Sequence, residues 1–328
     1  MLPGFMKAIK HIEYGPPERL ELTDLPRPSP GESEILIEVR AATVNRTDCA
    51  MMRAKPWIMR FVTGLWRPKK PVLGTDVAGT VVAAGAEVRE FAVGDRVFGF
   101  NDVGLGSHAE YAVVSAGDAL ATIPDGVSFE QAAASLEGAH YAINFINKVS
   151  IARGQEILVN GATGAIGSAA VQLLVAMDVR VTAVCGTAGV ASVTALGVER
   201  VIDYQKEDFT QLDTRFDHVF DCVGKSTFGR CKPLLKPKGV YISSELGPMA
   251  QNPWLALFTP IFGGRRVKFP VPKDRKQSVL TMQKHLREGT FRPLIDKIVG
   301  LDDLVEAFRF VETGEKMGNV VMAIGPAD

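Results

Sequence analysis

The chain has 328 residues, 46% of them hydrophobic and 23% charged, which is typical of a globular protein of about two domains. Its 37 Lys and Arg residues balance its 37 Asp and Glu residues. The resulting net charge of zero argues against a nucleic-acid-binding protein, which usually carries a basic excess. It also gives no support to electrostatic docking on an anionic membrane.

The four cysteines follow neither a disulfide framework nor a C-x-x-C spacing, so we expect free thiols in a reducing compartment. The sequence contains no run of about 20 apolar residues, the length that a membrane-spanning helix needs. The first residues also lack the basic and apolar regions of a secretory signal. The sequence therefore favours a cytoplasmic protein with no membrane span.

The first 128 residues predict short strands separated by turns, as in a compact β domain or barrel. Glu34–Val44 alternates apolar and polar residues with the period of a half-buried strand. The expected strands are Lys7–Glu13, Glu34–Val44, Val77–Ala84, Arg96–Phe98 and Ser107–Val114.

The pattern changes at Ser128, which forms a capping box with Gln131 and opens a helix. Strands then alternate with helices, which predicts a parallel sheet covered on both faces. The expected strands are Ile157–Asn160, Arg180–Cys185, Val201–Tyr204, His218–Cys222 and Gly239–Ser244, and the expected helices are Ala165–Met177 and Gly189–Leu196. The tail predicts helices at Lys276–Glu288 and Asp302–Gly314 and a closing strand at Asn319–Ile324. The apolar stretch Trp254–Phe262 fits a core or pocket helix.

A glycine-rich loop follows the expected strand Ile157–Asn160 and opens a helix, which is the context that a dinucleotide site requires. A helix N-terminus attracts a diphosphate. In such a site Gly161 permits the tight turn, Gly164 lets the phosphates approach the backbone, and Gly167 allows close helix–strand packing. The spacing is G-x-x-G-x-x-G rather than G-x-G-x-x-G, and a plain glycine-rich turn is the alternative. The expected cofactor residues of the loop are Gly161, Ala162, Thr163, Gly164, Ala165, Ile166 and Gly167.

The residues after the next strand favour NADPH over NADH. NAD-selective sites place an acidic residue about 20 residues after the loop, where it bonds the ribose 2′-hydroxyl. This chain has Cys185-Gly186-Thr187 there, so no acid would repel a 2′-phosphate. Thr187 and Tyr204 can supply hydroxyls and Lys206 can supply a cation, while NADH remains possible.

Several motifs together resemble the medium-chain dehydrogenase/reductase superfamily. Pro71–Val82 and Val93–Val97 resemble its N-terminal domain. The glycine loop and Val201–Tyr204 are similar to its zinc-independent quinone oxidoreductase branch, as are Asp221–Gly224 and Gly318–Val321. The resemblance covers nearly the whole chain.

The resemblance implies a two-domain α/β fold. It places a GroES-like β domain at 1–128, with 270–328 returning to it, and a doubly wound Rossmann domain at 129–269. It also implies cofactor contacts at Val223 and Asn319 and a homodimer joined at the Rossmann sheet edge.

The resemblance further implies an enzyme without a metal. The positions of the superfamily's catalytic zinc ligands fall on Asn45, Thr75 and the vicinity of Ser135. Asn and Thr do not replace Cys and His as zinc ligands. Without zinc, hydride transfer to a quinone or an activated C=C bond is favoured over alcohol oxidation, because such substrates delocalise the negative charge into their own carbonyl.

Five residues are candidates for the reaction itself. Asn45 and Asp48 match the branch's N-x-x-D motif. The Asn45 amide can bond a ribose hydroxyl or the substrate oxygen, with a plain turn as its alternative role, and Asp48 completes the motif, with a helix cap as its alternative role. His140 stands where many relatives have Thr, and it can donate a proton to an enolate. Tyr141 is the alternative donor, and Glu137 can orient His140 from the same helix face. A packed structural histidine, with water as the proton source, remains open.

The expected function is therefore an NADPH-dependent reductase of quinones or α,β-unsaturated carbonyls. Two alternatives remain. One is a zinc-free alcohol or aldehyde oxidoreductase of the same fold, and the other is an NADPH-binding regulatory protein without turnover.

Overall fold

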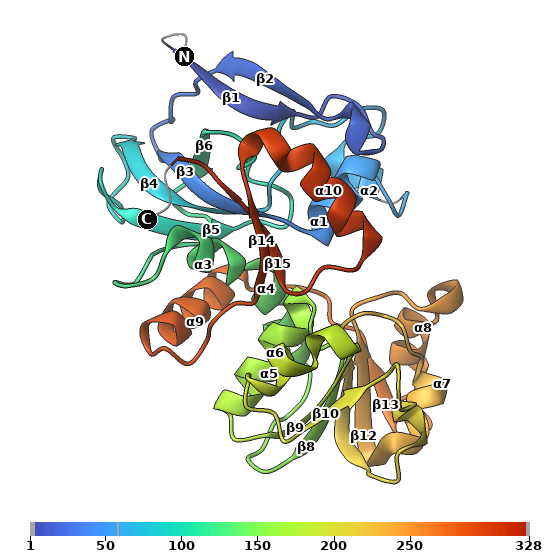
Figure 1. Ribbon diagram of the computed structural model, residues 1–328. Coiled ribbons are helices and arrows are strands. Elements are labelled where there is room, and N and C mark those ends of the chain that lie inside the picture. Colours follow the sequence, from blue (N-terminus) through green and yellow to red (C-terminus); the bar gives the residue numbers. More distant parts are fainter. Residues whose placement is uncertain (1–3, 58, 326–328) are drawn as a thin grey trace. The chain divides into compact units, whose positions relative to one another are not determined.

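The computed structural model describes residues 4–57 and 59–325, which form two compact units (Figure 1). The first unit combines the residues up to 137 with those from 274 onward, and the second unit comprises residues 138–273. The first unit is therefore discontinuous in sequence, and the second is one uninterrupted segment.

The first unit is built mainly from strands. They are β1 (Phe5–Lys10), β2 (Glu21–Pro26), β3 (Glu34–Val44), β4 (Asp76–Ala84), β5 (Arg96–Phe100), β6 (Tyr111–Ser115), β7 (Leu120–Thr122), β14 (Ile295–Val299) and β15 (Asn319–Ala323). Its helices are α1 (Arg46–Arg53), α2 (Met59–Thr63), α3 (Phe129–Ala134), α9 (Arg275–Arg287) and α10 (Leu304–Thr313). Seven strands form one sheet in the order β14-β15-β3-β4-β5-β7 with β6 paired to β3, while β1 and β2 form a hairpin.

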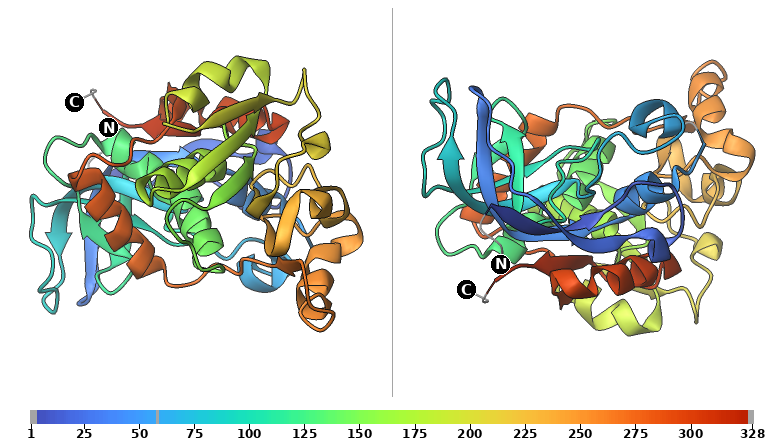
Figure 2. Two further views of the ribbon diagram at one scale, coloured as in Figure 1. Left: turned by 90° about the horizontal axis from the view of Figure 1, so that it is seen from below. Right: turned by 90° about the horizontal axis from the view of Figure 1, so that it is seen from above.

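The long strand β3 organises this unit because it pairs antiparallel with β4, β6 and the late strand β15. Val320 of β15 lies opposite Val44, the last residue of β3. Helix α10 packs on β3 and α1, and the two views of Figure 2 show it in dark red against the blue N-terminal segment. The C-terminal tail thus completes the sheet of the first unit.

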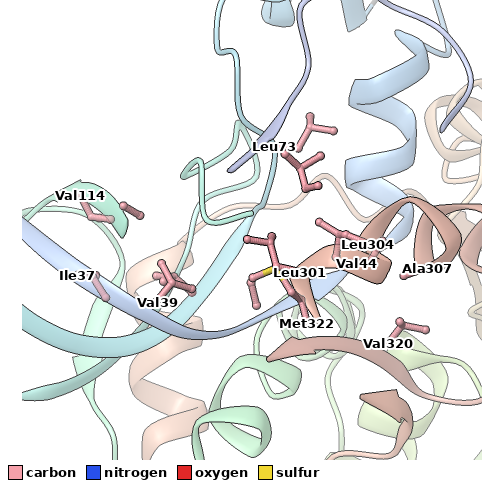
Figure 3. Close-up of a cluster of buried hydrophobic side chains, with 14 of the residues drawn as sticks. Ile37, Val39, Val44, Leu73, Val114, Leu301, Leu304, Ala307, Val320 and Met322 are labelled. Carbon is pink, nitrogen blue, oxygen red and sulfur yellow. The ribbon is translucent and has the colours of Figure 1, made fainter. Parts of the chain in front are cut away.

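The core of the first unit lies between its sheet and α10. Figure 3 shows apolar side chains of β3 and of the tail in one cluster, with Val44 beside Leu304, while Val39 and Met322 belong to the same cluster. All four of these side chains are fully buried. Burial of each large apolar side chain contributes about 1.5–3 kcal/mol and so stabilises the packing of the C-terminal segment on β3.

The second unit is a doubly wound parallel sheet. Its strands are β8 (Glu156–Asn160), β9 (Arg180–Cys185), β10 (Arg200–Asp203), β11 (Phe216–Asp221), β12 (Leu235–Ser243) and β13 (Arg266–Lys268). Its helices are α4 (Glu137–Ile146), which begins with the last residue of the first unit's earlier segment, α5 (Ala165–Ala176), α6 (Val190–Thr194), α7 (Phe228–Cys231) and α8 (Gln251–Phe258). The strand order is β10-β9-β8-β11-β12-β13, so the order reverses between β8 and β11, the place where such sheets bind ligands (Figure 1). The predicted GroES-like and Rossmann architecture is confirmed.

Several expected elements differ in detail. Strand β6 begins at Tyr111 rather than Ser107, because residues before it turn away to bond other segments, as when the N–H of His108 donates to the Leu73 carbonyl. Helix α3 packs on β3, β4 and β15, so the first unit extends past residue 128, where we expected the Rossmann domain to begin. Helix α8 ends at Phe258, and the segment Trp254–Phe262 is no core helix, since Trp254 is 61% and Phe262 84% exposed.

Among residues 4–57 and 59–325, no helix has the length and apolar character needed to cross a bilayer.

Candidate active site

The glycine loop joins β8 to α5 at the carboxyl edge of the second unit's sheet. Gly161 has a φ of +81°, a left-handed conformation that favours glycine. A Cβ on Gly167 would lie 2.1 Å from the Gly161 carbonyl oxygen, so only glycine lets α5 start this close to the loop. A Cβ on Gly164 would meet nothing nearer than 3.5 Å. The space above Gly164 is therefore open to a ligand.

The start of α5 suits an anion. Gly164 is its N-cap and offers no side chain to the first amide groups of this 12-residue helix. Those N–H groups and the helix dipole attract negative charge. The predicted loop residues Ala162, Thr163, Ala165 and Ile166 lie between or beside the glycines, and the arrangement fits the diphosphate of a dinucleotide.

The buried carboxylate of Asp221, which the sequence analysis named only as part of a family motif and not as a site residue, stabilises this edge of the sheet. It accepts hydrogen bonds from Asn160 Nδ2 at 2.9 Å, the Gly224 amide at 3.0 Å, the Ser226 amide at 3.1 Å and the Tyr241 hydroxyl at 2.9 Å. Asp221 could have been identified from the sequence, because it is an acidic residue that ends an apolar strand just before a glycine turn. The predicted cofactor residue Val223 comes two residues after Asp221 and packs against Gly161. A Cβ added to Gly161 would lie only 2.7 Å from the Cβ of Val223.

The ends of β9 and β10 bring the predicted ribose-side residues together. Asp203 lies opposite Cys185 in the sheet, and burial raises the pKa of the Cys185 thiol. The Thr187 hydroxyl donates to Asp203 Oδ2 at 2.6 Å. A Cβ on Gly186 would stand 3.2 Å from the Tyr204 hydroxyl, so Tyr204 leans over the β9 turn. An acid does therefore adjoin this turn, although it comes from the next strand rather than from the end of β9.

Helix α4 carries His140 and Tyr141 next to the glycine loop. A Cβ on Gly138 would lie 2.7 Å from the Ala165 carbonyl carbon, so the first turn of α4 packs directly on the start of α5. His140 is only 1% exposed, its backbone carbonyl accepts a bond from Asn144 Nδ2 at 2.9 Å, and its ring meets the Tyr141 ring edge-on at 5.7 Å. The two proton-donor candidates therefore lie together, with Tyr141 half-buried.

In the first unit, Asn45 is the N-cap of α1 and is 3% exposed. Its side-chain oxygen accepts from the Asp48 amide at 2.9 Å, and its Nδ2 donates to Thr43 Oγ1 at 3.2 Å and Thr75 Oγ1 at 2.6 Å. The Asp48 carboxylate in turn accepts a bond from the backbone N–H of Asn45 at 3.2 Å, which completes a capping box. The Asn45 amide thus has local partners for its oxygen and both its protons.

A cluster of buried acids adjoins this cap. Asp76 accepts bonds from both the amide and the hydroxyl of Thr43, and burial raises its pKa to about 7. Burial and the neighbouring Asp76 raise the pKa of Asp48 well above its usual value. His108 Nε2 bonds the Thr43 carbonyl at 2.9 Å, and burial lowers the pKa of His108 to about 4. Neutral forms are therefore favoured through this network.

Glu137 and Asn319, also predicted, complete the account of the first unit. The Thr47 hydroxyl donates to Glu137 Oε1 at 2.9 Å, and burial raises the Glu137 pKa while the cation of Lys316 opposes that rise. Asn319 begins β15, and its Nδ2 donates to the Leu294 carbonyl at 3.0 Å. Asn45, Asp48, Glu137 and Asn319 belong to the first unit, and the other candidates belong to the second.

The donor set around Asn45 does not fit zinc. Asn45 and Thr75 bond each other, and the Ser135 hydroxyl donates to the Gln131 carbonyl at 2.6 Å. Within the described part of the chain, no group of three or more His, Cys, Asp and Glu side chains could hold a metal ion. Structural and catalytic zinc sites need at least three such ligands.

Comparisons with known proteins agree with this architecture. Residues 31–125 match the alcohol dehydrogenase GroES-like domain, and residues 196–322 match a family model described as zinc-binding dehydrogenase. A 2-methylene-furan-3-one reductase of Solanum lycopersicum is 30% identical over 98% of this chain and 80% of its own length. A chloroplastic quinone oxidoreductase of Triphysaria versicolor is 29% identical over 98% of this chain and 99% of its own.

A solved structure extends the likeness to three dimensions. The quinone oxidoreductase from Coxiella burnetii superposes with a TM-score of 0.86 at 27% identity, and the match covers 98% of this chain and 100% of that chain.

Proposed function

The chain belongs to the medium-chain dehydrogenase/reductase superfamily, in its quinone oxidoreductase-like branch, and from this premise we propose a metal-free NADPH-dependent reductase of quinones or α,β-unsaturated carbonyls. Membership makes the chain an oxidoreductase that uses a nicotinamide cofactor and a small-molecule substrate. The choice of NADPH, the absence of zinc and the substrate class are the proposal.

The pairing of Asn45 with Thr75 carries the proposal. Where a zinc enzyme would present Cys and His, this chain presents an amide and a hydroxyl 2.6 Å apart that bond each other. Neither group is a soft or basic ligand of the kind zinc prefers. A substrate that takes up hydride here must therefore stabilise its own negative charge, as quinones and conjugated carbonyls do.

The residues of the second unit would hold and orient the reactants. The amides at the start of α5 and the open space above Gly164 fit the diphosphate. When bound, the nicotinamide supplies the hydride, and the substrate oxygen then needs a proton. His140 and Tyr141, packed beside this loop on α4, are the donors that we propose, with water as the alternative source.

The first test is NADPH oxidation with 1,2-naphthoquinone, a 2-alkenal and a simple aldehyde, each with and without a chelator. Chelator-resistant turnover of the quinone or the alkenal supports the proposal. Turnover of the aldehyde alone moves the assignment to a carbonyl oxidoreductase. Binding of NADPH without turnover of any acceptor favours a non-catalytic binding protein.

The proton donor is tested by His140→Gln and Tyr141→Phe, with His285→Gln as the control. His285 lies on α9 and bonds the Thr290 hydroxyl at 2.8 Å, so its loss removes a histidine from another place in the chain. A donor variant should lower kcat about 10²-fold or more and change the pH profile of kcat. Unchanged profiles in both variants would assign the proton to water.

We also propose a homodimer and a cytoplasmic location. Strands β10 and β13 end the order of the second unit's sheet, and the end strand of a sheet is a site where a second copy can pair. Light scattering after size exclusion tests the dimer: a mass near twice 35.4 kDa supports it, and a mass near 35.4 kDa contradicts it. The location remains a prediction.

A further inference from the structure

Positive charge is concentrated in one part of the neutral chain, residues 53–70, which we call the basic segment. It includes α2, which Figure 1 labels. No Asp or Glu stands between Asp48 and Asp76. The basic segment supplies all the cations of that stretch, namely Arg53, Lys55, Arg60, Arg67, Lys69 and Lys70. The zero net charge of the whole chain therefore conceals a local excess that attracts anionic partners.

Most of these cations have no counter-charge within the protein. Arg53 is paired with Glu312, since Arg53 Nη2 donates to Glu312 Oε2 at 2.6 Å. None of the other cations of the basic segment forms an ion pair with a residue that the structure describes. The side chains of Lys55, Arg67 and Lys69 are exposed to solvent. These three cations are therefore available to an anionic partner.

The basic segment also exposes large apolar side chains. The exposed fractions are 64% for Trp57, 61% for Phe61, 46% for Leu65 and 84% for Trp66. The rings of Trp57 and Phe61 meet edge-on, with their centroids 5.1 Å apart. Exposed aromatic groups gathered among cations mark an interaction surface rather than an ordinary solvated face.

An apolar cavity of about 240 Å³ adjoins the basic segment within the first unit. Met51, Val72 and Leu73 line the cavity, and Lys69 and Lys70 belong to the same lining. Apolar surface beside cations suits an amphiphile, because an anionic head and an aliphatic body then each meet a matching group. A nucleic acid offers the negative charge but no aliphatic body. The surroundings of the basic segment therefore favour a lipid over a nucleic acid.

We propose that the basic segment docks the protein on an anionic lipid bilayer, with its lysines and arginines against the headgroup phosphates. In this arrangement Trp57, Phe61 and Trp66 insert among the headgroups, where aromatic side chains are favoured and nearby cations add electrostatic attraction. Such docking is peripheral and requires no membrane-spanning helix. The inference goes beyond the proposed reaction and does not rest on it, because it concerns a surface of the first unit alone.

The first experiment measures co-sedimentation of the native chain with lipid vesicles, in the absence of cofactor and substrate. One set of vesicles is phosphatidylcholine alone, and the other is an equimolar mixture of phosphatidylcholine and phosphatidylserine. The chain should bind the mixed vesicles and bind the neutral ones far more weakly. Raising the salt from about 0.1 M to 1 M should weaken the binding, because the Debye length falls from about 10 Å to about 3 Å.

A triple variant tests the cations of the basic segment, and a second triple variant is its matched control. Each cation near an anionic membrane strengthens binding about fivefold, so loss of three should weaken it about 100-fold. The test variant combines Lys55→Gln, Arg67→Gln and Lys69→Gln. The control removes the same charge at exposed positions outside the basic segment, and should bind nearly as the native chain does; it combines Lys232→Gln, Lys284→Gln and Arg287→Gln.

Tryptophan fluorescence tests insertion separately. The chain has three tryptophans, of which Trp57 and Trp66 belong to the basic segment and Trp254 lies on α8. In a Trp254→Phe variant, all tryptophan emission therefore comes from the basic segment. Vesicles with bromine on their acyl chains should quench this emission and shift its maximum to shorter wavelength. Quenching that occurs in the native chain and disappears in Trp254→Phe would place α8 on the bilayer instead and would overturn the inference.

The remaining outcomes decide between a lipid and other occupants. The inference is wrong if the native chain fails to bind the mixed vesicles at about 0.1 M salt, or if the two triple variants lose affinity equally. Binding of a DNA duplex without binding of vesicles would assign the basic segment to a nucleic acid. A dimer that Trp66→Ser converts to a monomer, without vesicle binding, would assign it to a second copy.

The controls keep the test separate from the proposed function and from misfolding. Vesicle binding is measured without NADPH or a quinone, so a chain that binds vesicles but turns over no acceptor contradicts only the proposed function. Circular dichroism establishes that each variant is folded. If a triple variant is not, quenching in the singly substituted Trp254→Phe variant decides the question.

Discussion

Replacing Gly164 by Ala should abolish tight cofactor binding while leaving the fold intact. Gly164 has φ −68° and ψ 167°, which any residue adopts, and its added Cβ would meet only the Gly161 carbonyl oxygen at an ordinary 3.5 Å. Alanine is a poorer N-cap than glycine, which costs about 0.5–1 kcal/mol. It also restricts the unfolded chain, which gains about 0.4–1 kcal/mol. Stability should therefore change by less than about 1 kcal/mol.

Binding should change far more, because the new methyl group would occupy the space above the N-terminus of α5. Loss of one backbone bond to a charged phosphate costs about 1.5–3 kcal/mol, or roughly 10- to 150-fold in Kd. Fluorescence titration with NADPH measures this, and urea unfolding measures the stability.

Gly167→Ala is the contrasting variant. Its Cβ would press on the Gly161 carbonyl oxygen at 2.1 Å, so it should destabilise the chain by about 1–3 kcal/mol. If Gly164→Ala bound NADPH as tightly as the native chain, the diphosphate would not lie above Gly164, and the site argued from this loop would be refuted.

Three further predictions concern the buried acids Asp76 and Asp221 and the metal-free site. Because burial raises the pKa of Asp76 to about 7 from 3.8, the stability that protonated Asp76 contributes should be full below about pH 4 and be lost as pH rises through about 7. Asp76→Asn should flatten this decline in urea unfolding at pH 4 to 8, and an unchanged slope would count against Asp76. Asp221→Ala would leave four donors without their acceptor, and each loss should cost about 1–3 kcal/mol of stability. Circular dichroism should therefore show little folded protein. Dialysis against a chelator should change neither the melting temperature nor quinone turnover, and restoration of lost activity by Zn²⁺ would contradict a metal-free site.

Local patterns were sufficient to predict the elements with strong periodicity. The alternation in Glu34–Val44 predicts β3 with the bounds observed, and the Ser128 capping box predicts the start of α3. The short strands β2, β7, β13 and β14 were not predicted, because three to six residues carry little periodic signal and their partners lie elsewhere in the chain.

The candidate site was predictable in its loop and less so in its polar contacts. The spacing of the glycines is visible in the sequence itself and was enough to predict the loop. The bond between Asn45 and Thr75 joins residues 30 positions apart, and the bond between Thr187 and Asp203 depends on β9 and β10 being neighbours. Such contacts follow from strand pairing, which one sequence does not reveal. The exposure of Trp254 was missed because an apolar helix face gives the same pattern whether or not anything covers it.

The pairing of β15 with β3 also sets the order in which the chain can fold during its synthesis. The second unit is one continuous segment, so its parallel sheet can form as soon as Lys273 has emerged. Strand β3 waits longer, because β15 follows about 50 residues later, roughly 2.5–10 s at ordinary rates of translation. During that interval one edge of β3 has no partner and can pair with other nascent chains. When β15 is made, it pairs with that edge of β3. We therefore expect this late strand to limit aggregation of the chain during its synthesis.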